Sequence, residues 1–386
     1  MTRPGVAIGT AGLAARTGRV GRAGGRAGLH STVETTEVVV IGAGQAGLSS
    51  AYFLRRFGLG TVVLDAAAGP GGAWRHRSPS LTMDKVHGIF DLPGVPDGVE
   101  AAGDRPAAEV VPEYYGDYER RVGLEVLRPV KVAAVREGKD GRLVVAADAG
   151  EWAARAVVNA TGTWTRPYWP YYPGAAGFLG EQLHYAGYHG PAAFAGRRVV
   201  VVGGGASAMH VLSEVAGVAA GTVWVTRRPP VFRGDDFGED ARREAVALVE
   251  ARVRAGLPPQ SVVSVTGLGY SVVVREAMAK GALERLPMFR RLTPYGVEWA
   301  DGRQTAADVV VWATGFRSAL DHLAPLRLRE PGGGIKVDGT RVVREPRLQL
   351  VGHGPSASTV GANRAGRTAA RNIHALLTSR PALPAA

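Results

Sequence analysis

The chain has 386 residues, 46% of them hydrophobic, which is ordinary for a globular protein and enough for two domains with a sizeable core. It contains no cysteine, so disulfide scaffolds, thiolate metal sites and redox-active dithiols are excluded, and we expect no metal. The net charge of +12 comes mostly from arginine, but no basic run alternates with aromatic residues and no apolar run approaches bilayer length. We therefore expect a cytoplasmic protein that binds anionic cofactors and has no nucleic-acid or membrane partner.

Residues 1–33 are rich in arginine, glycine and alanine, lack acidic residues and show no helical or strand period. A secretory signal would need an unbroken apolar stretch, which glycine and threonine interrupt here. We interpret this segment as a disordered or spurious N-terminal extension, and we place the start of the first domain at residue 34.

A short β-branched run, Glu37–Ile41, predicts a buried parallel strand that leads directly into a glycine-rich turn. The amphipathic segment Leu48–Phe57 predicts a helix, and the strand predicted at Thr61–Leu64 is followed by an acidic residue. This order is typical of a dinucleotide-binding unit, in which glycines let a pyrophosphate approach the helix N-terminus and the acid binds a ribose. The predicted cofactor-binding residues are Gly42, Gly44, Gln45, Ala46, Gly47 and Asp65.

The segment that follows supplies two more candidate residues and a change of architecture. Gly72 and Trp74 are candidates for contact with a flat cofactor ring, although a plain surface loop fits the same residues. Val110–Val122 predicts a helix, whose tyrosines we assign to packing. Short β-branched runs separated by turn residues across Leu124–Asn159 predict a β-meander inserted into the α/β domain. The Trp-, Tyr- and Pro-rich stretch Thr163–Pro173 has the composition of a linker and marks a domain junction.

A second dinucleotide unit follows this linker. Arg197–Val202 predicts a strand, a glycine turn opens a helix, and a further strand is predicted at Thr222–Val225. This strand ends in arginines instead of an acid, which suits a ribose 2′-phosphate, so we interpret the first site as FAD or NAD and the second as NADPH. Two surface arginines without a ligand are the alternative. The predicted cofactor-binding residues are Gly203, Gly205, Ala206, Ser207, Ala208, Arg227 and Arg228.

The remaining chain returns to strands that end in small residues. We expect a helix over Glu239–Ala255, a connector or lid over Pro258–Arg291 and a hairpin over Gly296–Ala307. A strand ending in Ala-Thr-Gly then predicts cofactor contacts at Thr314 and Gly315, and the last strand, Leu348–Val351, predicts one at Gly352. A closing helix is predicted at Thr359–Leu377.

These motifs together resemble those of the class B flavoprotein monooxygenases, which comprise flavin-containing, Baeyer–Villiger and YUCCA-type enzymes. Phe178, Gly180, His184 and Tyr188 have the spacing of the identifying motif of the flavin-containing branch, just before the second glycine turn. The Ala-Thr-Gly strand end and the Gly-Gly-Ala-Trp segment match two further family motifs. The chain departs at Pro355, where many two-nucleotide flavoproteins have aspartate.

The resemblance implies an α/β fold with two Rossmann-like domains, for FAD and NADPH, and a β-meander inserted in the FAD domain. It divides the chain into an FAD-binding first part (34–165), an NADPH-binding domain (166–304) and an FAD-binding second part (305–386). It further implies hydride transfer from NADPH to FAD, capture of O2 as a C4a-(hydro)peroxide, and oxygen transfer to a small sulfide, amine or ketone. His184 is then the candidate residue nearest the chemistry, with a role in coupling the two domains.

Two other functions fit a chain with two dinucleotide sites. One is an NADPH-dependent flavin oxidase or reductase that passes electrons to another acceptor, such as a quinone or ferredoxin. The other is a non-catalytic flavin-binding redox sensor or regulator. Flavin disulfide reductases are excluded because the dithiol relay needs cysteine.

Overall fold

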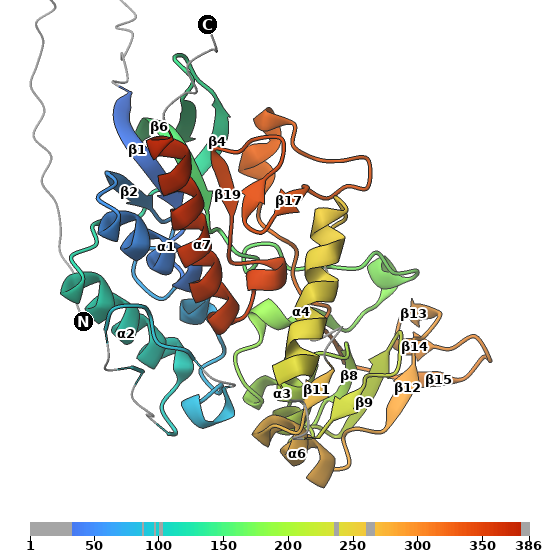
Figure 1. The fold of residues 1–386 in the computed structure, drawn as a ribbon. Helices are drawn as coiled ribbons and strands as arrows, with labels where there is room; N and C mark the ends of the chain where they lie inside the picture. Colours follow the sequence, from blue (N-terminus) through green and yellow to red (C-terminus); the bar gives the residue numbers. More distant parts are fainter. Residues whose placement is uncertain are drawn as a thin grey trace, which may run out of the picture. The chain divides into compact units, whose positions relative to one another are not determined.

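The structure is a computed structural model that describes residues 33–86, 89–95, 98–99, 103–234, 239–259 and 267–379. The predicted N-terminal extension therefore lies outside the described residues, apart from Val33. Within the described ranges, the two largest sheets are built mainly of parallel strands and have helices packed on them (Figure 1). The predicted α/β class with two Rossmann-like domains is confirmed.

The larger sheet has a parallel centre in the order β19-β6-β1-β2-β3. Val38, Val39 and Val40 at its middle are fully buried, because both faces of the sheet are covered, and this explains the unbroken β-branched run. Strands β17 and β18 extend one edge in antiparallel fashion. The strands are β1 (Glu34–Ile41), β2 (Thr61–Leu64), β3 (Val126–Leu127), β6 (Gly150–Asn159), β17 (Val337–Asp338), β18 (Arg341–Val342) and β19 (Leu348–Leu350).

The predicted meander consists of β4 (Val132–Glu137), β5 (Leu143–Ala147) and β6, which pair antiparallel in chain order. Asp140 and Gly141 both have positive φ angles at the turn between β4 and β5. Strand β3 differs from the expectation, because it pairs parallel with β2 and belongs to the central sheet instead of the meander.

Helices cover one face of the larger sheet. Helices α1 (Gln45–Arg56) and α7 (Thr359–Thr378) lie side by side there, and α2 (Ala107–Arg121) joins the same core. Tyr115 and Tyr118 of α2 are buried in this core, as expected for packing residues. The other face packs against the meander and the short helix η6 (Asp321–Leu326), whose Leu323 is buried.

The smaller sheet is parallel throughout, in the order β12-β9-β8-β16-β7. Two helices, α3 (Ala206–Val215) and α6 (Val272–Ala279), pack on one face, and an antiparallel sheet of β13, β14 and β15 packs on the other. The strands are β7 (Glu181–His184), β8 (Arg198–Val202), β9 (Gly221–Thr226), β12 (Arg285–Pro287), β13 (Arg291–Thr293), β14 (Gly296–Glu298), β15 (Gln304–Ala306) and β16 (Val309–Trp312). Strands β14 and β15 form the hairpin predicted within Gly296–Ala307.

The remaining elements are short, apart from α4 (Glu239–Arg254), which matches the predicted helix. Strands β10 (Phe232–Arg233) and β11 (Leu268–Gly269) pair with each other. The short 3₁₀ helices are η1 (Gly72–His76), η2 (Met83–Lys85), η3 (Ala175–Gly177), η4 (Tyr185–Gly187), η5 (Ala192–Phe194) and η7 (Gly354–Ser356).

Two assignments made from the sequence differ from the structure. The stretch expected to be a connector contains α6 and β12, and β12 is the edge strand beside β9. Strand β16 lies beyond residue 305, where the second part of the FAD domain was expected to begin, but it pairs with β8 and β7 in the smaller sheet. A strand that is buried on both faces needs neighbours on both sides, and local patterns do not reveal which sheet supplies them.

The contact between α1 and α7 depends on Gly366. A Cβ atom at Gly366 would lie 2.7 Å from the Ser49 Oγ and 2.8 Å from the Ser50 backbone nitrogen. Alanine normally favours a helix over glycine by about 1 kcal/mol, but here the two helices would have to separate. We expect Gly366→Ala to lower the free energy of unfolding in urea by about 1–3 kcal/mol.

The matched control is Gly177→Ala, because a Cβ atom there would meet no atom within 4 Å. Its stability should stay within about 0.5 kcal/mol of the wild-type value. Equal or greater stability of the Gly366→Ala protein would contradict this packing of α1 on α7.

Candidate functional site

The first glycine turn is packed so tightly that two of its glycines have no room for a side chain. Gly42 has a φ angle of +96°, and a Cβ atom there would lie 2.7 Å from the Ala160 carbonyl oxygen. A Cβ atom on Gly47 would lie 1.8 Å from the Gly42 carbonyl oxygen. The end of β6 is therefore pressed against the turn between β1 and α1.

The middle glycine of the same turn faces open space instead. The nearest atom to a Cβ on Gly44 would be the Gly72 Cα, 4.0 Å away. Gly44 is also the N-cap of α1, with no capping side chain and no acidic residue in the first helical turn. Free N–H groups and the positive end of the helix dipole thus face a space that a side chain on Gly44 would fill. Such a space can accept the phosphates of a dinucleotide.

The second glycine turn repeats this arrangement on the smaller sheet. A Cβ atom on Gly203 would lie 2.2 Å from the Ala313 carbonyl oxygen, whereas one on Gly205 would meet no atom within 4 Å. Helix α3 begins after Gly205, again without a capping side chain or an acidic residue in its first turn. Within α3, Ala208 is fully buried against the sheet, while Ala206 is exposed and Ser207 is half-buried.

The acidic residue after β2 belongs to a buried ion cluster that the sequence analysis missed. Arg128 Nε donates to Asp65 Oδ2 at 3.0 Å, and its two terminal nitrogens donate to both carboxylate oxygens of Glu119 at 2.7 and 2.8 Å. Burial opposes the charge of Arg128, but hydrogen bonds from the guanidinium to Glu119 and Asp65 outweigh it and raise the pKa of Arg128. A ribose beside Asp65 would therefore meet a charged donor as well as an acceptor. Its position could have indicated this contact, because Arg128 follows β3, the strand that pairs with β2.

The side chain of Gln45, one of the predicted cofactor-binding residues, makes hydrogen bonds inside the protein. Its Oε1 accepts from the Tyr115 hydroxyl at 2.8 Å. Its Nε2 donates to the Phe90 carbonyl oxygen at 2.7 Å and to Asn363 Oδ1 at 3.2 Å. Only the backbone of Gln45, at the start of α1, is left to contact a cofactor.

Two other predicted residues lie against the first turn. A Cβ atom on Gly352 would lie 3.4 Å from Ala46 Cβ, so the end of the last strand reaches the start of α1. The backbone nitrogen of Gly352 donates to Ser356 Oγ at 2.9 Å, which fixes the turn after β19. Trp74 is half-buried and packs against the core that contains α1 and α2.

His184 connects the linker to the end of β16 through both ring nitrogens. Nδ1 accepts from the Ala186 backbone nitrogen at 3.0 Å, and Nε2 lies 3.1 Å from the Gly315 carbonyl oxygen, which can only accept. The ring is buried, and burial lowers its pKa. A neutral imidazole with both nitrogens engaged has no free site for general acid or base chemistry. Thr314 Oγ1 also donates to the linker, at the Tyr168 carbonyl oxygen.

Arg227 and Arg228 lie at the end of β9, where the predicted 2′-phosphate site was expected. Both are exposed, and within the described part of the chain their side chains have no hydrogen-bond or ion-pair partner. The Thr226 hydroxyl donates to the Arg228 carbonyl oxygen at 2.8 Å and accepts from Arg285 Nε at 2.8 Å. Arg285 on the edge strand β12 is thus a third arginine at this strand end, and no sequence pattern marked it.

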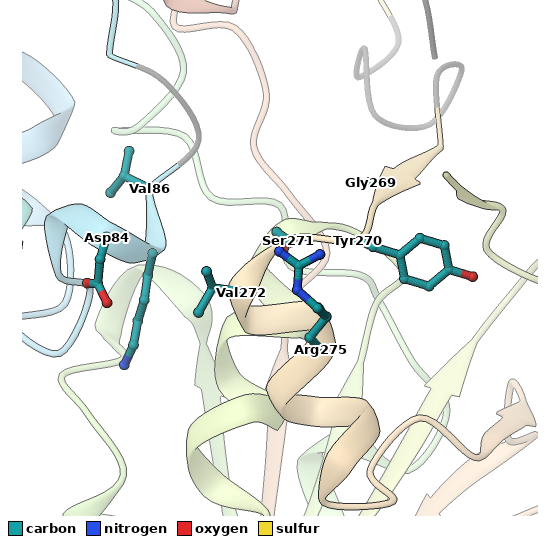
Figure 2. Close-up of a pocket in the computed structure, with 8 residues that line it drawn as sticks. Asp84, Val86, Gly269, Tyr270, Ser271, Val272 and Arg275 are labelled. Carbon is teal, nitrogen blue, oxygen red and sulfur yellow. The ribbon is translucent and has the colours of Figure 1, made fainter. Parts of the chain in front are cut away.

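A pocket of about 320 Å³ lies between η2 and the start of α6. Figure 2 shows Asp84 and Val86 on one side, with Val272 and Arg275 of α6 on the other. Tyr270 and Ser271, which directly precede α6, line the pocket on the same side as that helix. Among the described residues, no group of His, Asp or Glu side chains is placed to hold a metal ion, and no helix is long and apolar enough to cross a membrane.

Known proteins share this arrangement. The sequence profile of the pyridine nucleotide-disulphide oxidoreductase family matches residues 39–253. A solved structure of a flavin-containing monooxygenase from Stenotrophomonas maltophilia is 40% identical, with a TM-score of 0.78, and the match covers 90% of this chain and all of that one. Because the present chain has no cysteine, it shares the fold of the oxidoreductase family without a dithiol.

Two curated relatives match most of the chain at lower identity. An indole-3-pyruvate monooxygenase of the YUCCA type from Oryza sativa subsp. japonica is 28% identical over 336 residues, which cover 75% of this chain and 76% of that protein. A ferredoxin–NADP reductase from Cupriavidus pinatubonensis is 28% identical over 271 residues, 68% of this chain and 70% of that protein. Taken with the profile and the solved structure, these matches show that the chain belongs to the flavin-containing monooxygenases of the pyridine nucleotide-disulphide oxidoreductase family, NADPH-dependent enzymes that use FAD.

Proposed function

We propose that this monooxygenase binds FAD at the first glycine turn and NADPH at the second, and oxygenates a small organic sulfide, amine or ketone. The FAD contacts are then the predicted residues of the larger sheet together with Gly72, Trp74 and Gly352. The NADPH contacts are the residues of the Gly203–Ala208 turn, Arg227 and Arg228. The name of the rice relative states an oxo acid as its substrate, which supports keeping carbonyl compounds in the proposed class.

The observation that carries this proposal is the pair of helix N-termini without capping side chains, one on each sheet. When bound, NADPH supplies a hydride and FAD supplies the activation of O2. The chain itself contributes binding and orientation, because the glycine turns accept phosphates through backbone N–H groups. His184 acts as a positioning residue, since its two hydrogen bonds join the segment after β7 to the turn after β16.

A second candidate function is electron transfer from NADPH to a protein acceptor. The observation in its favour is the similarity to a ferredoxin–NADP reductase over 68% of the chain. Such an enzyme would use the same two nucleotide sites without inserting oxygen into a product.

The two open-faced glycines make a reciprocal test of the cofactor assignment. A Cβ atom at Gly44 would come no closer than 4.0 Å to another atom, and one at Gly205 would meet no atom within 4 Å, so valine at either position would extend into the proposed phosphate space. We expect Gly44→Val to yield folded protein without visible flavin absorbance. Gly205→Val should stay yellow and lose binding of NADP⁺ in calorimetry.

Far-UV circular dichroism provides the control for folding of both variants. Flavin retained by Gly44→Val, or lost from Gly205→Val, would show that the cofactors are assigned to the wrong turns.

The arginines after β9 make a test of the 2′-phosphate assignment. Replacing Arg227 and Arg228 by Ala removes two charge-assisted contacts that NADPH makes and NADH lacks. We expect the KM for NADPH to rise by about 10- to 100-fold while the KM for NADH changes by less than about threefold.

The matched control is the double variant Arg341→Ala/Arg344→Ala, which removes the same charge from the larger sheet, where these residues pair with Asp338 and Glu330. Its two KM values should match those of the wild type. An equal rise in the KM for NADPH and for NADH in the Arg227/Arg228 variant would refute a 2′-phosphate site at the end of β9.

A further inference from the structure

Arg77, directly after η1, has a guanidinium group that no counter-ion among the described residues contacts. Its Nε atom is buried and has no hydrogen-bond partner. The guanidinium carbon lies 4.5 Å from the centre of the Trp164 ring and 5.5 Å from that of Trp74, so the cation is held against two indoles. Its polar neighbour is the Tyr185 hydroxyl, and within the described residues no carboxylate pairs with it.

A chain of hydrogen bonds leads from Tyr185, beside Arg77, to a buried carboxylate on α3. The Tyr185 hydroxyl lies 3.2 Å from His210 Nδ1, and His210 Nε2 lies 3.2 Å from Glu214 Oε1. An ionised carboxylate can only accept, so the hydrogen bonds run from the Tyr185 hydroxyl through His210 to Glu214. A His210 that carries its proton on Nε2 satisfies both of its partners.

Glu214 is fully engaged by other donors. Its Oε2 accepts from the Ser80 hydroxyl and from the Tyr188 hydroxyl, both at 2.7 Å. Its Oε1 lies 3.4 Å from Lys85 Nζ in addition to its bond from His210. Burial alone would raise the pKa of Glu214, but the hydrogen bonds from His210, Ser80 and Tyr188 outweigh it and lower that pKa to about 2.

Counting charges across this network leaves one positive charge unmatched. Lys85 and Arg77 are cations, Glu214 is the single carboxylate among these residues, and it already pairs with Lys85. Removing a charge from water without a partner is costly, and buried charges in proteins are therefore normally paired. A ligand that brings a negative oxygen would supply the missing partner.

The residues around Arg77 come from segments near both sheets. Gly72, at the start of η1, approaches Gly44 of the first turn. Trp164 follows the end of β6 and stacks on Phe316, which follows the end of β16, with ring centres 4.8 Å apart. Tyr185 follows β7, and Arg77 as a whole keeps part of its surface accessible.

We propose that Arg77 binds an oxyanion, a phosphate or carboxylate group of a ligand that lies between the two sheets. The source is a bound dinucleotide or an organic acid substrate, and the Trp74 and Trp164 rings hold the guanidinium in place for it. This inference rests on the cofactor sites proposed above but not on the oxygenation chemistry, because the test measures binding at equilibrium.

The test compares the FAD-loaded wild-type protein with Arg77→Gln and Arg77→Met. Both substitutions remove the charge, and methionine preserves an unbranched side chain between the two indoles. Isothermal titration measures the Kd of NADP⁺, of phenylpyruvate and of phenylacetone, a neutral ketone without the carboxylate. Visible absorbance measures the FAD retained after gel filtration. Arg75→Gln is the matched control, since Arg75 is exposed on the same η1 and its side chain donates to the Pro70 carbonyl oxygen.

We expect each Arg77 variant either to raise the Kd of NADP⁺ or of phenylpyruvate by about tenfold or more, or to lose FAD. Arg75→Gln should keep the wild-type Kd values and the wild-type FAD content. A higher Kd for NADP⁺ identifies the dinucleotide as the source of the anion, and loss of FAD identifies the flavin cofactor's phosphates. A preference of the wild type for phenylpyruvate over phenylacetone that the variants lack identifies a substrate carboxylate. Folded variants with wild-type affinities and wild-type FAD content would overturn the proposal.

Discussion

The close approach of backbone to backbone at the two glycine turns is the constraint on which this structure depends. In the larger sheet the carbonyl of Ala160, at the end of β6, occupies the place of a side chain on Gly42. In the smaller sheet the carbonyl of Ala313, at the end of β16, does the same for Gly203. Each Ala-Thr-Gly strand end thus presses against the turn that opens the neighbouring helix. The packed glycines fix the turn, and the open glycine beside them leaves the helix N-terminus free for a phosphate.

The end of β16 also binds the segments that lead into the smaller sheet. His184 donates to the carbonyl of Gly315, and Thr314 donates to the linker carbonyl of Tyr168. The motif tyrosine, Tyr188, donates to Glu214 on α3, which also binds Ser80 and Lys85 from the segment after the Gly-Gly-Ala-Trp motif. Two residues of the identifying motif, His184 and Tyr188, therefore bind segments that lie far from them in the sequence, which supports the positioning role proposed for His184.

Local patterns predicted the elements whose signal lies within a few residues. The run from β1 through the glycine turn, α1 and β2 to Asp65 was predicted in the correct order, because strand, turn and helix each leave a periodic or glycine signature. Sheet membership beyond neighbouring strands was not predictable in this way. Strand β16 resembles the end of β6 in sequence but pairs with β8, and only long-range contacts decide that.

Single charged residues were equally difficult to predict. Arg128 and Arg77 carry no motif, and their importance comes from what folding brings to them, which is Asp65 with Glu119 in one case and two indoles in the other. Gln45 is the opposite case, because it lies inside the glycine motif but its side chain forms hydrogen bonds with Tyr115 and Asn363 in the protein interior.

The most direct measurement is the fate of oxygen during turnover with NADPH. The FAD-loaded enzyme would be supplied with isotopically labelled O2 and, in separate reactions, thioanisole, N,N-dimethylaniline and phenylacetone. NADPH consumed, hydrogen peroxide formed and label in the product would be quantified together. The proposed function predicts that at least one of these classes yields a product with one labelled oxygen atom per NADPH consumed and little peroxide. The proposed function would be contradicted if the hydrogen peroxide formed equalled the NADPH consumed with all three substrates. It would also be contradicted if NADPH were consumed without labelled product and this consumption became faster when ferredoxin was added.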